Sequence, residues 1–455
     1  MRKKLRTVFI PIETTSREFH YKLVLAHKLA RAGCRVVVGQ AGYLDKISKC
    51  FPSGVYLGKN IFKTLFPTSQ VCYIRYKTMG WDVLHLDEEG GVFAGREKEW
   101  IQQLDRRLDP SVLNEHDKIL CWGEFQARHY RGKSHNSKVI ATGQPKFYYK
   151  DVEYRAIFDQ FSVGSDYILF NMNFAAFNSL ISLTDFLTSS DSHRHSKDDD
   201  YSYKRDVWLD NGANLIAILN VIKKLLEDDR FNHLHFIVRP HPAENQAIYE
   251  NMFLGKKRVL VTKEGTAIEW ALNSKAVVHH GCTTGVESFL AGVKVINFRE
   301  SVVHSSVENL IANSVGLRIN NYDELCDYLL DPKCNNGIEN IDLCHSMISN
   351  FDKDLNSFEK VVDETNDSLK RHQPGYMSLF LDLVVIMQAI LLLIKYVPRL
   401  LMKNKLLFYK REREKFKIFK PYIVKNKVSV VNEISKSNIQ VKKIRSRYFV
   451  LEKSN

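Results

Sequence analysis

The sequence lacks the cysteine and histidine spacing of a metal site. Its eight cysteines are scattered over 455 residues and form no CxxC pair. Scattered cysteines of this kind are typical of reduced, buried thiols in an intracellular protein. A secretory leader is also missing, because Glu13 and Arg17 interrupt the apolar run that follows the basic residues 1–6. We therefore expect a cytoplasmic protein that needs no metal.

The body of the chain has no excess of charge of either sign. Residues 391–455 hold 18 Lys and Arg against 4 Asp and Glu, which accounts for the whole net charge of +14. The preceding 390 residues carry 48 of each sign. A nucleic-acid enzyme is expected to have a basic stripe on its body, so we expect no nucleic-acid partner and assign the charge to an appendage.

The length and the apolar pattern predict an α/β protein of two Rossmann-like, doubly wound domains that face a cleft. Residues 7–12 predict a strand, 17–33 a helix that stops at Gly33, and 35–39 a second strand. Further strands are predicted at 71–75, 83–86, 118–122, 138–142, 167–171, 235–239, 259–261, 277–280 and 293–297, and a helix at 211–228.

Composition changes along the chain suggest the domain limits. The polar residues 188–205 predict a surface insertion, in which Asp198–Asp200 is either a solvated loop or a metal site. The predicted parts are an N-terminal domain at 1–160, a nucleotide-binding domain at 161–350, a connecting helical segment at 351–375, a membrane-associated helix at 376–402 and a basic tail at 403–455.

Residues 377–397 form an apolar run of 21 residues, which is long enough to cross a bilayer. Asp382 would be costly inside a membrane, and a single crossing would send the basic tail outside. An in-plane helix with Lys and Arg on anionic lipid avoids both problems. The alternative is a buried helix of the soluble fold.

Polar residues follow three predicted strands of the second domain, where an open α/β sheet binds ligands. Arg239, His241, Pro242 and Glu244 follow one strand, and Asn171 and Asn173 follow another. The third strand leads into a turn and a helix start that can bind phosphate through hydroxyl and amide groups. The turns at residues 239–244 and 281–287 have a plainer interpretation as capped strand ends. The candidates of the third turn are His280, Gly281, Thr283, Thr284, Gly285 and Glu287, with His279 and His280 on opposite faces.

Three carboxylates follow one strand of the first domain. Asp87, Glu88 and Glu89 precede two glycines, and any of them could act as a general base or as a nucleophile. A polar turn is the plainer interpretation. Glu13 and Arg17, at the first strand–helix turn, are further candidates for a substrate cleft, as is Lys146.

Five ordered motifs resemble those of bacterial surface carbohydrate biosynthesis proteins, which are similar to capsule-type Kdo transferases. The resemblance covers roughly residues 7–350 and rests on residues 86–90, 141–147, 170–174, 239–242 and 280–287. It implies a GT-B glycosyltransferase that uses a CMP-activated ulosonic acid, either Kdo or a nonulosonic, sialic-like acid. The acceptor would be a surface polysaccharide or a lipid-linked glycan, and the enzyme would work at the inner face of the cytoplasmic membrane.

The resemblance also implies roles for single residues. His241 and Pro242 would contact CMP, Thr283 and Thr284 would bind its phosphate, and Glu89 lies nearest to the position of the carboxylate nucleophile. Glutamate instead of aspartate beside the glycine leaves nucleophile and base unresolved, and Lys146 replaces an arginine that is frequent in the family. No metal or other cofactor is implied.

Two other functions are compatible with the same motifs. A CDP-glycerol-type polyol-phosphate transferase also has a His-Pro turn and a Gly-x-Pro turn, and would use a histidine as base. A membrane-docked scaffold would bind a nucleotide without turning it over.

Overall fold

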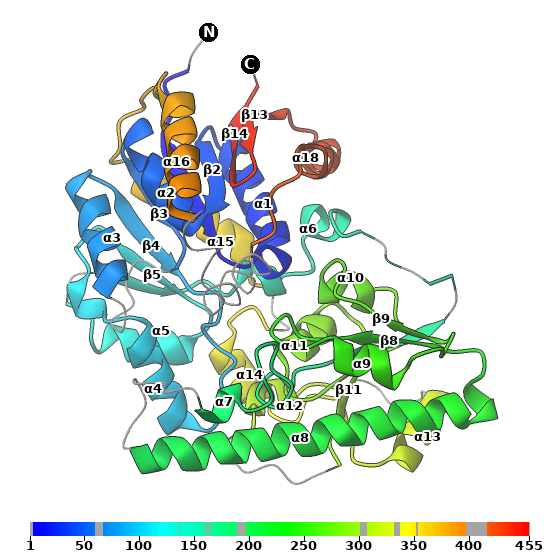
Figure 1. The fold of residues 1–455 in the computed structure, drawn as a ribbon. Helices are drawn as coiled ribbons and strands as arrows, with labels where there is room; N and C mark the ends of the chain where they lie inside the picture. Colours follow the sequence, from blue (N-terminus) through cyan, green and yellow to red (C-terminus); the bar gives the residue numbers. More distant parts are fainter. Residues whose placement is uncertain are drawn as a thin grey trace. The chain divides into compact units, whose positions relative to one another are not determined.

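The computed structural model describes residues 3–59, 67–135, 137–159, 161, 163–164, 166–188, 197–300, 307–331, 337–351, 354–396 and 416–454. They form two compact units (Figure 1). Unit 1 comprises Met1–Gly91, Leu104–Phe158 and Ser346–Asn455, and unit 2 comprises Val92–Gln103 and Asp159–His345. Each unit is built on one mainly parallel sheet. The predicted fold class, an α/β chain of GT-B type with two Rossmann-like sheets, is therefore confirmed.

The sheet of unit 1 has eight strands in the order β13-β14-β2-β1-β3-β4-β5-β6. The six strands from β2 to β6 are parallel, and the chain winds outward from β1 in both directions. Their bounds are β1 (Thr7–Ile12), β2 (Arg35–Gln40), β3 (Gly54–Leu57), β4 (Asp82–Leu86), β5 (Lys118–Cys121) and β6 (Lys138–Ala141).

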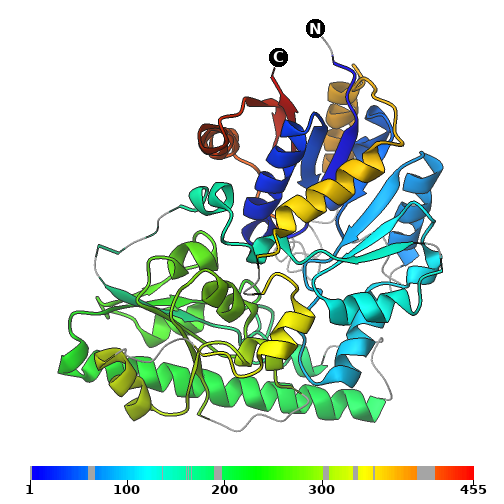
Figure 2. The same cartoon turned by 180° about the vertical axis from the view of Figure 1, so that it is seen from behind.

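Helix α1 (Thr15–Arg31) is the central helix of unit 1 and is buried over most of its surface, because it contacts β2, β14, α15 and α18. Gly33 follows its C-cap residue, Ala32, and has a φ of +94°, in the left-handed region that favours glycine. Figure 2 shows α15 (Ser357–Leu369) lying against α1 and β3. The other helices are α2 (Ala41–Ile47), α3 (Pro67–Thr78), α5 (Glu124–Arg131), α6 (Val152–Ala156), α16 (Leu381–Tyr396), α18 (Pro421–Ser435) and α4 (Glu97–Arg107), whose residues 97–103 count with unit 2.

Residues 416–454 of the predicted basic tail are folded as part of unit 1, so the prediction of a separate tail was wrong for these residues. The hairpin of β13 (Ile439–Arg445) and β14 (Tyr448–Lys453) extends the sheet of unit 1, with β14 antiparallel to β2. A buried ion pair joins Arg35 Nε to Glu452 Oε1 at 2.6 Å. Gly39 allows the close approach, because a Cβ at this position would lie 2.7 Å from Cβ of Tyr448. The hairpin closes an edge that β2 would otherwise expose.

The predicted membrane-associated segment contains α16, which packs on α2. Asp382 in its first turn is paired with Lys443 Nζ at 2.7 Å and with Arg445 Nη2 at 2.9 Å. Among the described helices, none combines the length and the apolarity that a membrane crossing requires. The remainder of the segment, residues 397–402, lies outside the described residues.

The sheet of unit 2 has the order β12-β11-β10-β7-β8-β9, and all of its strands are parallel. The winding reverses between β7 and β10, which makes their carboxyl ends the topological switch point. The strands are β7 (Tyr167–Asn171), β8 (His235–Arg239), β9 (Val259–Val261), β10 (Ala276–His279), β11 (Val295–Phe298) and β12 (Leu317–Ile319). The helices are α7 (Asp185–Thr188), α8 (Lys197–Glu227), α9 (Ala247–Met252), α10 (Ala267–Ala271), α11 (Thr283–Leu290), α12 (Leu310–Asn313), α13 (Tyr322–Leu330) and α14 (Ile341–Met347), whose last residues count with unit 1.

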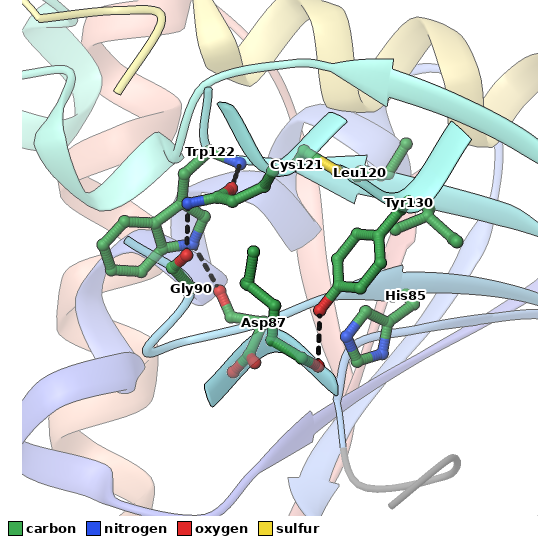
Figure 3. A pocket seen from close by; sticks show the side chains of 10 residues that line it. His85, Asp87, Gly90, Leu120, Cys121, Trp122 and Tyr130 are labelled. Carbon is green, nitrogen blue, oxygen red and sulfur yellow. Dashed lines mark hydrogen bonds between the residues drawn. The ribbon is translucent and has the colours of Figure 1, made fainter. Parts of the chain in front are cut away.

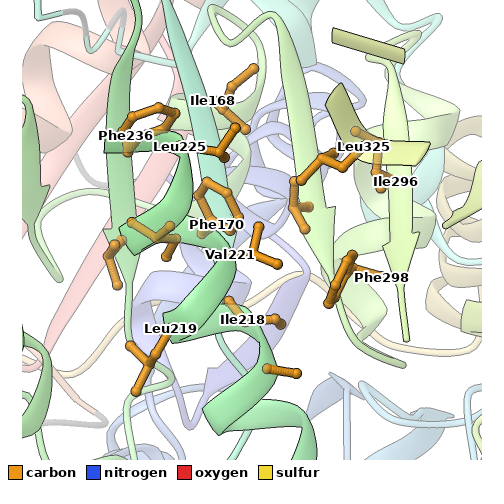
Figure 4. Packing of buried hydrophobic residues seen from close by; sticks show 14 of the residues in the cluster. Ile168, Phe170, Ile218, Leu219, Val221, Leu225, Phe236, Ile296, Phe298 and Leu325 are labelled. Carbon is orange, nitrogen blue, oxygen red and sulfur yellow. The ribbon is translucent and has the colours of Figure 1, made fainter. Parts of the chain in front are cut away.

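The core of unit 2 lies between its sheet and α8. Figure 4 shows Phe170 and Phe236 of the strands facing Val221 and Leu225 of the helix. All four are nearly inaccessible to solvent. The helix is 31 residues long and includes Asp198–Asp200, so the prediction of a loop there was wrong. The apolar residues 215–225 dock the helix, and the polar residues before them continue its turns.

Two predictions for unit 1 also differ from the structure. Residues 71–75 belong to α3 and not to a strand. The buried residues of this segment are Tyr73 and Tyr76, three apart as on a helix, whereas Val71 and Ile74 are exposed. Strand β3, between β1 and β4, was not predicted, because three apolar residues after a glycine give too short a signal.

Because β14 pairs with β2, we expect that truncating a buried side chain of β14 lowers the free energy of unfolding. Leu451 is fully buried, so Leu451→Ala should lower the free energy of unfolding by about 2–5 kcal/mol. Leu379→Ala, at a side chain that is 72% exposed, is the matched control and should change it by less than about 0.5 kcal/mol. Urea unfolding followed by circular dichroism measures both. Equal values for the two variants would contradict the pairing of the hairpin with the sheet.

Candidate functional site

Charged residues gather at the carboxyl ends of the central strands of unit 1. Glu13 follows β1, Lys59 follows β3, and the acidic turn Asp87–Glu89 follows β4. Lys59 Nζ lies 3.1 Å from Glu13 Oε2 and 3.9 Å from Glu18 Oε1. Because β1 and β3 are the neighbours at which the winding reverses, this is the ligand-binding edge of a doubly wound sheet.

Glu88 points into the protein. Lys22 Nζ lies 2.5 Å from Glu88 Oε1 and 2.7 Å from Glu18 Oε2, and it donates to the carbonyl of Pro11 at 2.6 Å. The hydroxyl of Tyr21 donates to the same Glu88 carboxylate. Burial acts to lower the pKa of Lys22, but the two carboxylates outweigh it and raise that pKa. Glu88 therefore attaches the acidic turn to α1 and does not face substrate.

Asp87 is held by an ion pair in which one nitrogen of Arg107 contacts both carboxylate oxygens. Arg107 Nη1 lies 3.1 and 3.0 Å from its two carboxylate oxygens. Burial would raise the pKa of Asp87, but Arg107 dominates and the pKa falls to about 2. The backbone carbonyl of Asp87 accepts from Trp122 Nε1 at 2.6 Å and from Gln144 Nε2 at 2.9 Å. This carboxylate is ionised and fixed in position.

Glu89 is the most exposed of the three carboxylates, with 45% of its side chain accessible. Its oxygens lie 2.6 Å from Arg17 Nη2 and 2.8 Å from Arg107 Nη2. Burial opposes the effect, but Lys59, Arg17 and Arg107 hold the pKa of Glu89 far below its usual range. A carboxylate that stays ionised is a weak general base but can act as a nucleophile or stabilise positive charge.

Sequence reasoning identified the acidic turn and Arg17, but not the residues that surround them. Lys22 was detectable as the partner of Glu18 four positions earlier on a helix. Lys59 follows the strand that was not predicted, and Arg107 lies eighteen positions after Glu89 without a local signal. Lys146, a candidate for the cleft, is buried over the rings of Trp122 and Phe147 and donates to the Glu88 carbonyl at 3.4 Å.

A small pocket lies beneath the acidic turn (Figure 3). His85, Asp87, Trp122 and Tyr130 line it together with apolar residues of β5. The turn lies directly on the indole, since a Cβ at Gly91 would come within 2.7 Å of the Trp122 ring. The glycines after the carboxylates therefore allow the turn to pack on the protein, and this packing fixes its conformation.

In unit 2 the strands of the switch point carry Asn171 and His279, which are register partners on β7 and β10. Gly281 follows with a left-handed φ of +55°, and Cys282 caps α11. Cys282 Sγ accepts from the Thr284 amide at 3.3 Å and from Asn171 Nδ2 at 3.2 Å. The predicted turn is thus formed, and Asn171 helps to hold it.

Two neighbouring histidines at the end of β10 have different environments. His279 lies under α11, where a Cβ on Gly285 would be 2.4 Å from its ring, and burial lowers its pKa to about 3. His280 stacks on Phe174 and places its Nε2 3.2 Å from Asp210 Oδ2. Its Nδ1 lies 3.4 Å from the carbonyl of Phe298. Both ring nitrogens of His280 therefore have partners within unit 2, and Gly285 makes room for His279.

The Arg-Pro-His-Pro turn after β8 is also formed. Arg239 is 8% exposed and donates to the carbonyls of Glu264 and Gly265, both at 2.6 Å. The Ala243 amide donates to His241 Nδ1 at 3.2 Å, so a neutral His241 carries its proton on Nε2. Arg239 fixes a neighbouring loop, and His241 is half-buried.

Glu244 is fully buried and is used by the fold. It accepts from the Phe174 amide and from the Tyr249 hydroxyl, the latter at 2.6 Å. Of the remaining candidates, Pro242 is exposed, and the side chains that are half-buried at the strand ends are Asn173, Thr283, Thr284 and Glu287.

Comparison with known proteins gives no family. No family model matches the chain, and no curated protein matches it. Solved structures of several nucleotide-sugar proteins are similar in fold. One is the UDP-GlcNAc 2-epimerase from Methanocaldococcus jannaschii, with 13% identity, 80% of this chain and 100% of that chain covered, and a TM-score of 0.47.

Two further similar structures are a glycosyltransferase and a polymerase. The glycosyltransferase SnogD from Streptomyces nogalater has 12% identity, with 85% of this chain and 99% of that chain covered, and a TM-score of 0.37. A variant of the wall teichoic acid polymerase TagF has 12% identity, with 81% of this chain and 90% of that chain covered, and a TM-score of 0.40. Similarities of this size do not assign a donor, an acceptor or a reaction.

Glu244 predicts a pH dependence of stability in unit 2. Burial raises its pKa to about 7, and the bonds from Tyr249 and Phe174 only partly oppose this. The folded state therefore holds a proton that the unfolded chain releases near pH 4. The stabilisation is complete below that pH and is lost as pH rises through about 7, by about 3 kcal/mol at most.

Urea unfolding of the wild type and of Glu244→Gln between pH 5 and 8.5 measures this effect. The wild type should lose stability over this range, and the variant should lose about 3 kcal/mol less. Glu250→Gln, at an exposed neighbour on α9, is the control and should follow the wild type. Parallel curves for all three proteins would show that Glu244 does not hold the proton.

Proposed function

We propose that the chain is a glycosyltransferase that transfers a 3-deoxy-ulosonic acid, Kdo or a sialic-like acid, from a CMP-sugar to a surface-polysaccharide or lipid-linked acceptor. The observation that carries the proposal is Glu89: a partly exposed carboxylate at the β4 end, kept ionised by two guanidinium groups. The motif resemblance and the two Rossmann-like units support the same reaction class.

In the proposed reaction, a Glu89 oxygen attacks the anomeric carbon and the bond from that carbon to the phosphate oxygen breaks. CMP leaves with the electron pair, and a glycosyl ester of Glu89 remains. An acceptor hydroxyl then attacks the same carbon, Glu89 leaves as carboxylate, and the hydroxyl proton passes to solvent. Arg17 and Arg107 would stabilise the carboxylate before and after the intermediate.

The nucleotide would bind to unit 2. Thr283 and Thr284 hydroxyls with the amides at the start of α11 would bind the phosphate, and His241 Nε2 would donate to CMP. No metal is assigned, and the described residues contain no group of three or more His, Cys, Asp or Glu that could hold one. Cationic side chains and helix amides would carry the charge of the leaving phosphate.

A second candidate is a polyol-phosphate transferase of CDP-glycerol type, which shares the His-Pro turn and the Gly-x-Pro turn. That reaction transfers a phosphoryl-polyol, so its product gains phosphate, whereas a glycosyl transfer adds none. A nucleotide-binding scaffold would turn over neither donor.

The donor is tested with a thermal-shift panel of cytidine and uridine nucleotides, followed by incubation with radiolabelled CMP-Kdo, CMP-sialic acid and CDP-glycerol. We expect stabilisation by CMP over UMP and UDP, and transfer of label from a CMP-sugar without phosphate. Preferential stabilisation by UDP, or a product that contains phosphate, would overturn the CMP-ulosonate proposal.

Glu89→Gln should lower kcat by at least about 10³-fold, because the amide cannot form the ester. Its melting temperature should stay near that of the wild type, since the side chain is 45% exposed. Glu115→Gln is the matched control at a carboxylate that is 74% exposed, and it should retain full activity. Turnover by Glu89→Gln at the wild-type rate would exclude Glu89 as the nucleophile.

We also propose that α16 docks on anionic phospholipid at the inner face of the membrane. Leu383, Ile386, Met387 and Ile390 share one helix face by their spacing and are 49–56% exposed. Lys443 and Arg445 of the hairpin pair with Asp382 of the same helix, so the charge that would oppose insertion is matched. An apolar face beside basic residues is typical of an in-plane membrane helix.

The triple variant Leu383→Ser, Ile386→Ser, Ile390→Ser should lose at least about 100-fold in affinity for phosphatidylserine-containing vesicles, because three apolar side chains can no longer enter the lipid. Co-sedimentation of the full chain measures this. Removing residues 376–455 is unsuitable, since it would take β14 from the sheet. The matched control is Leu209→Ser, Ile216→Ser, Leu254→Ser at exposed positions of unit 2. Equal sedimentation of all three proteins would contradict the docking proposal.

A further inference from the structure

Arg299 lies directly after β11, and its guanidinium is aimed at the turn between β10 and α11. The side chain is 4% exposed. Arg299 Nη2 lies 3.6 Å from the place that a Cβ on Gly281 would occupy, and Asn313 Oδ1 lies 3.5 Å from the same place. Because Gly281 has no side chain, these two polar groups border a space at the start of α11.

The charge of Arg299 is incompletely matched. Its ion pair is with Glu308, at 3.3 Å between Nη1 and Oε1. Glu308 is shared with Arg96, whose Nη2 lies 2.8 Å from Oε2. Two guanidinium groups thus face one carboxylate, and the amide start of α11 adds partial positive charge. Asp210 and Glu339 also act on Arg299, and Asp210 is paired with His280.

Several buried polar atoms around the turn have no hydrogen-bond partner in the described residues. They include Arg299 Nε and Asn313 Oδ1. Arg299 Nε is a donor, and a buried donor without a partner is costly, so its persistence at a ligand-binding edge indicates an absent ligand.

We propose that Arg299 binds a phosphoryl group of the nucleotide at the Gly281 turn, together with the amides at the start of α11. This inference rests on the proposed function for the identity of the nucleotide, but not for the anionic group. Arg96 is a positioning residue, because it neutralises Glu308 and leaves the charge of Arg299 for the ligand. Gly281 provides the space in which a phosphoryl oxygen can approach the guanidinium.

Arg96 belongs to a segment that is far in sequence from the rest of unit 2. Val92–Gln103 belongs to unit 2, although it follows the acidic turn of unit 1 in sequence. Gly95 forms an isolated parallel bridge with Asn309, and the Gly95 amide donates to the Glu308 carbonyl at 2.8 Å. A segment of the first half of the chain thereby helps to build the proposed phosphate site of the second half.

Isothermal titration of the full chain with CMP and with cytidine tests the proposal. Arg299→Gln should weaken CMP binding about 10- to 100-fold, the size of a lost charge-assisted hydrogen bond, and should leave cytidine binding within about twofold. The affinity of Arg299→Lys for CMP should lie between those of the wild type and of Arg299→Gln, because lysine keeps the charge but loses the planar guanidinium. Arg230→Gln, at an exposed arginine paired with Asp228, is the matched control and should bind as the wild type.

A second variant covers the case in which Arg299→Gln does not fold, as judged by its melting temperature. Gly281→Ala places a methyl group 3.6 Å from Arg299 Nη2 and should also weaken CMP more than cytidine. If CMP and cytidine weaken by the same factor in the folded variant, or if neither changes, the inference is overturned. If cytidine binds too weakly to measure, the binding of inorganic phosphate to the wild type and the variants is measured instead by ³¹P NMR.

The same experiment separates this inference from the proposed function. If UMP or UDP binds better than CMP but still depends on Arg299, the CMP donor is wrong and the phosphate site stands. If no nucleotide binds but inorganic phosphate binds in an Arg299-dependent way, the nucleotide-sugar reaction is excluded and the site again stands. If neither nucleotides nor inorganic phosphate bind to the wild type, the site is excluded.

Discussion

The ammonium group of Lys22 is the constraint on which unit 1 depends. It is buried and contacts the carboxylates of Glu18 and Glu88 and the carbonyl of Pro11. A buried charge is tolerated only when its partners are fixed around it, so α1, the end of β1 and the end of β4 are held together at one point. With Glu88 drawn inward, its neighbour Glu89 is left at the surface, where Arg17 and Arg107 hold it.

The two units differ in which titratable groups at their strand ends are charged. In unit 1, carboxylates follow the strands, and arginines and lysines keep them ionised. In unit 2, burial favours the neutral forms of Glu244 and His279, and cationic side chains remain near the start of α11. An ionised carboxylate suits attack on a sugar carbon, and an excess of positive charge suits a phosphate. This division agrees with the roles that we propose.

Strands with strong apolar runs were predictable because their signal is local. Those at Thr7–Ile12, Tyr167–Asn171 and His235–Arg239 have the bounds that the pattern indicated. The signal failed where tertiary contacts decide the structure. Residues 71–75 have the pattern of a strand but form part of helix α3. The buried tyrosines of this helix, Tyr73 and Tyr76, are three positions apart and therefore lie on one helix face. Likewise, nothing local in the basic residues after 436 indicates a hairpin that pairs with β2.

The sequence by itself determined the two Rossmann-like sheets, the order of the polar turns after their strands and the presence of three carboxylates in one of these turns. Apolar periodicity and strand-end position are local properties, so a single sequence is enough to detect them. Only the tertiary structure decided which carboxylate is exposed, that Arg107 lies beside Glu89, and that Arg299 lies beside Gly281. These outcomes depend on contacts between residues far apart in the chain, and on the cost of burying a charge without a partner.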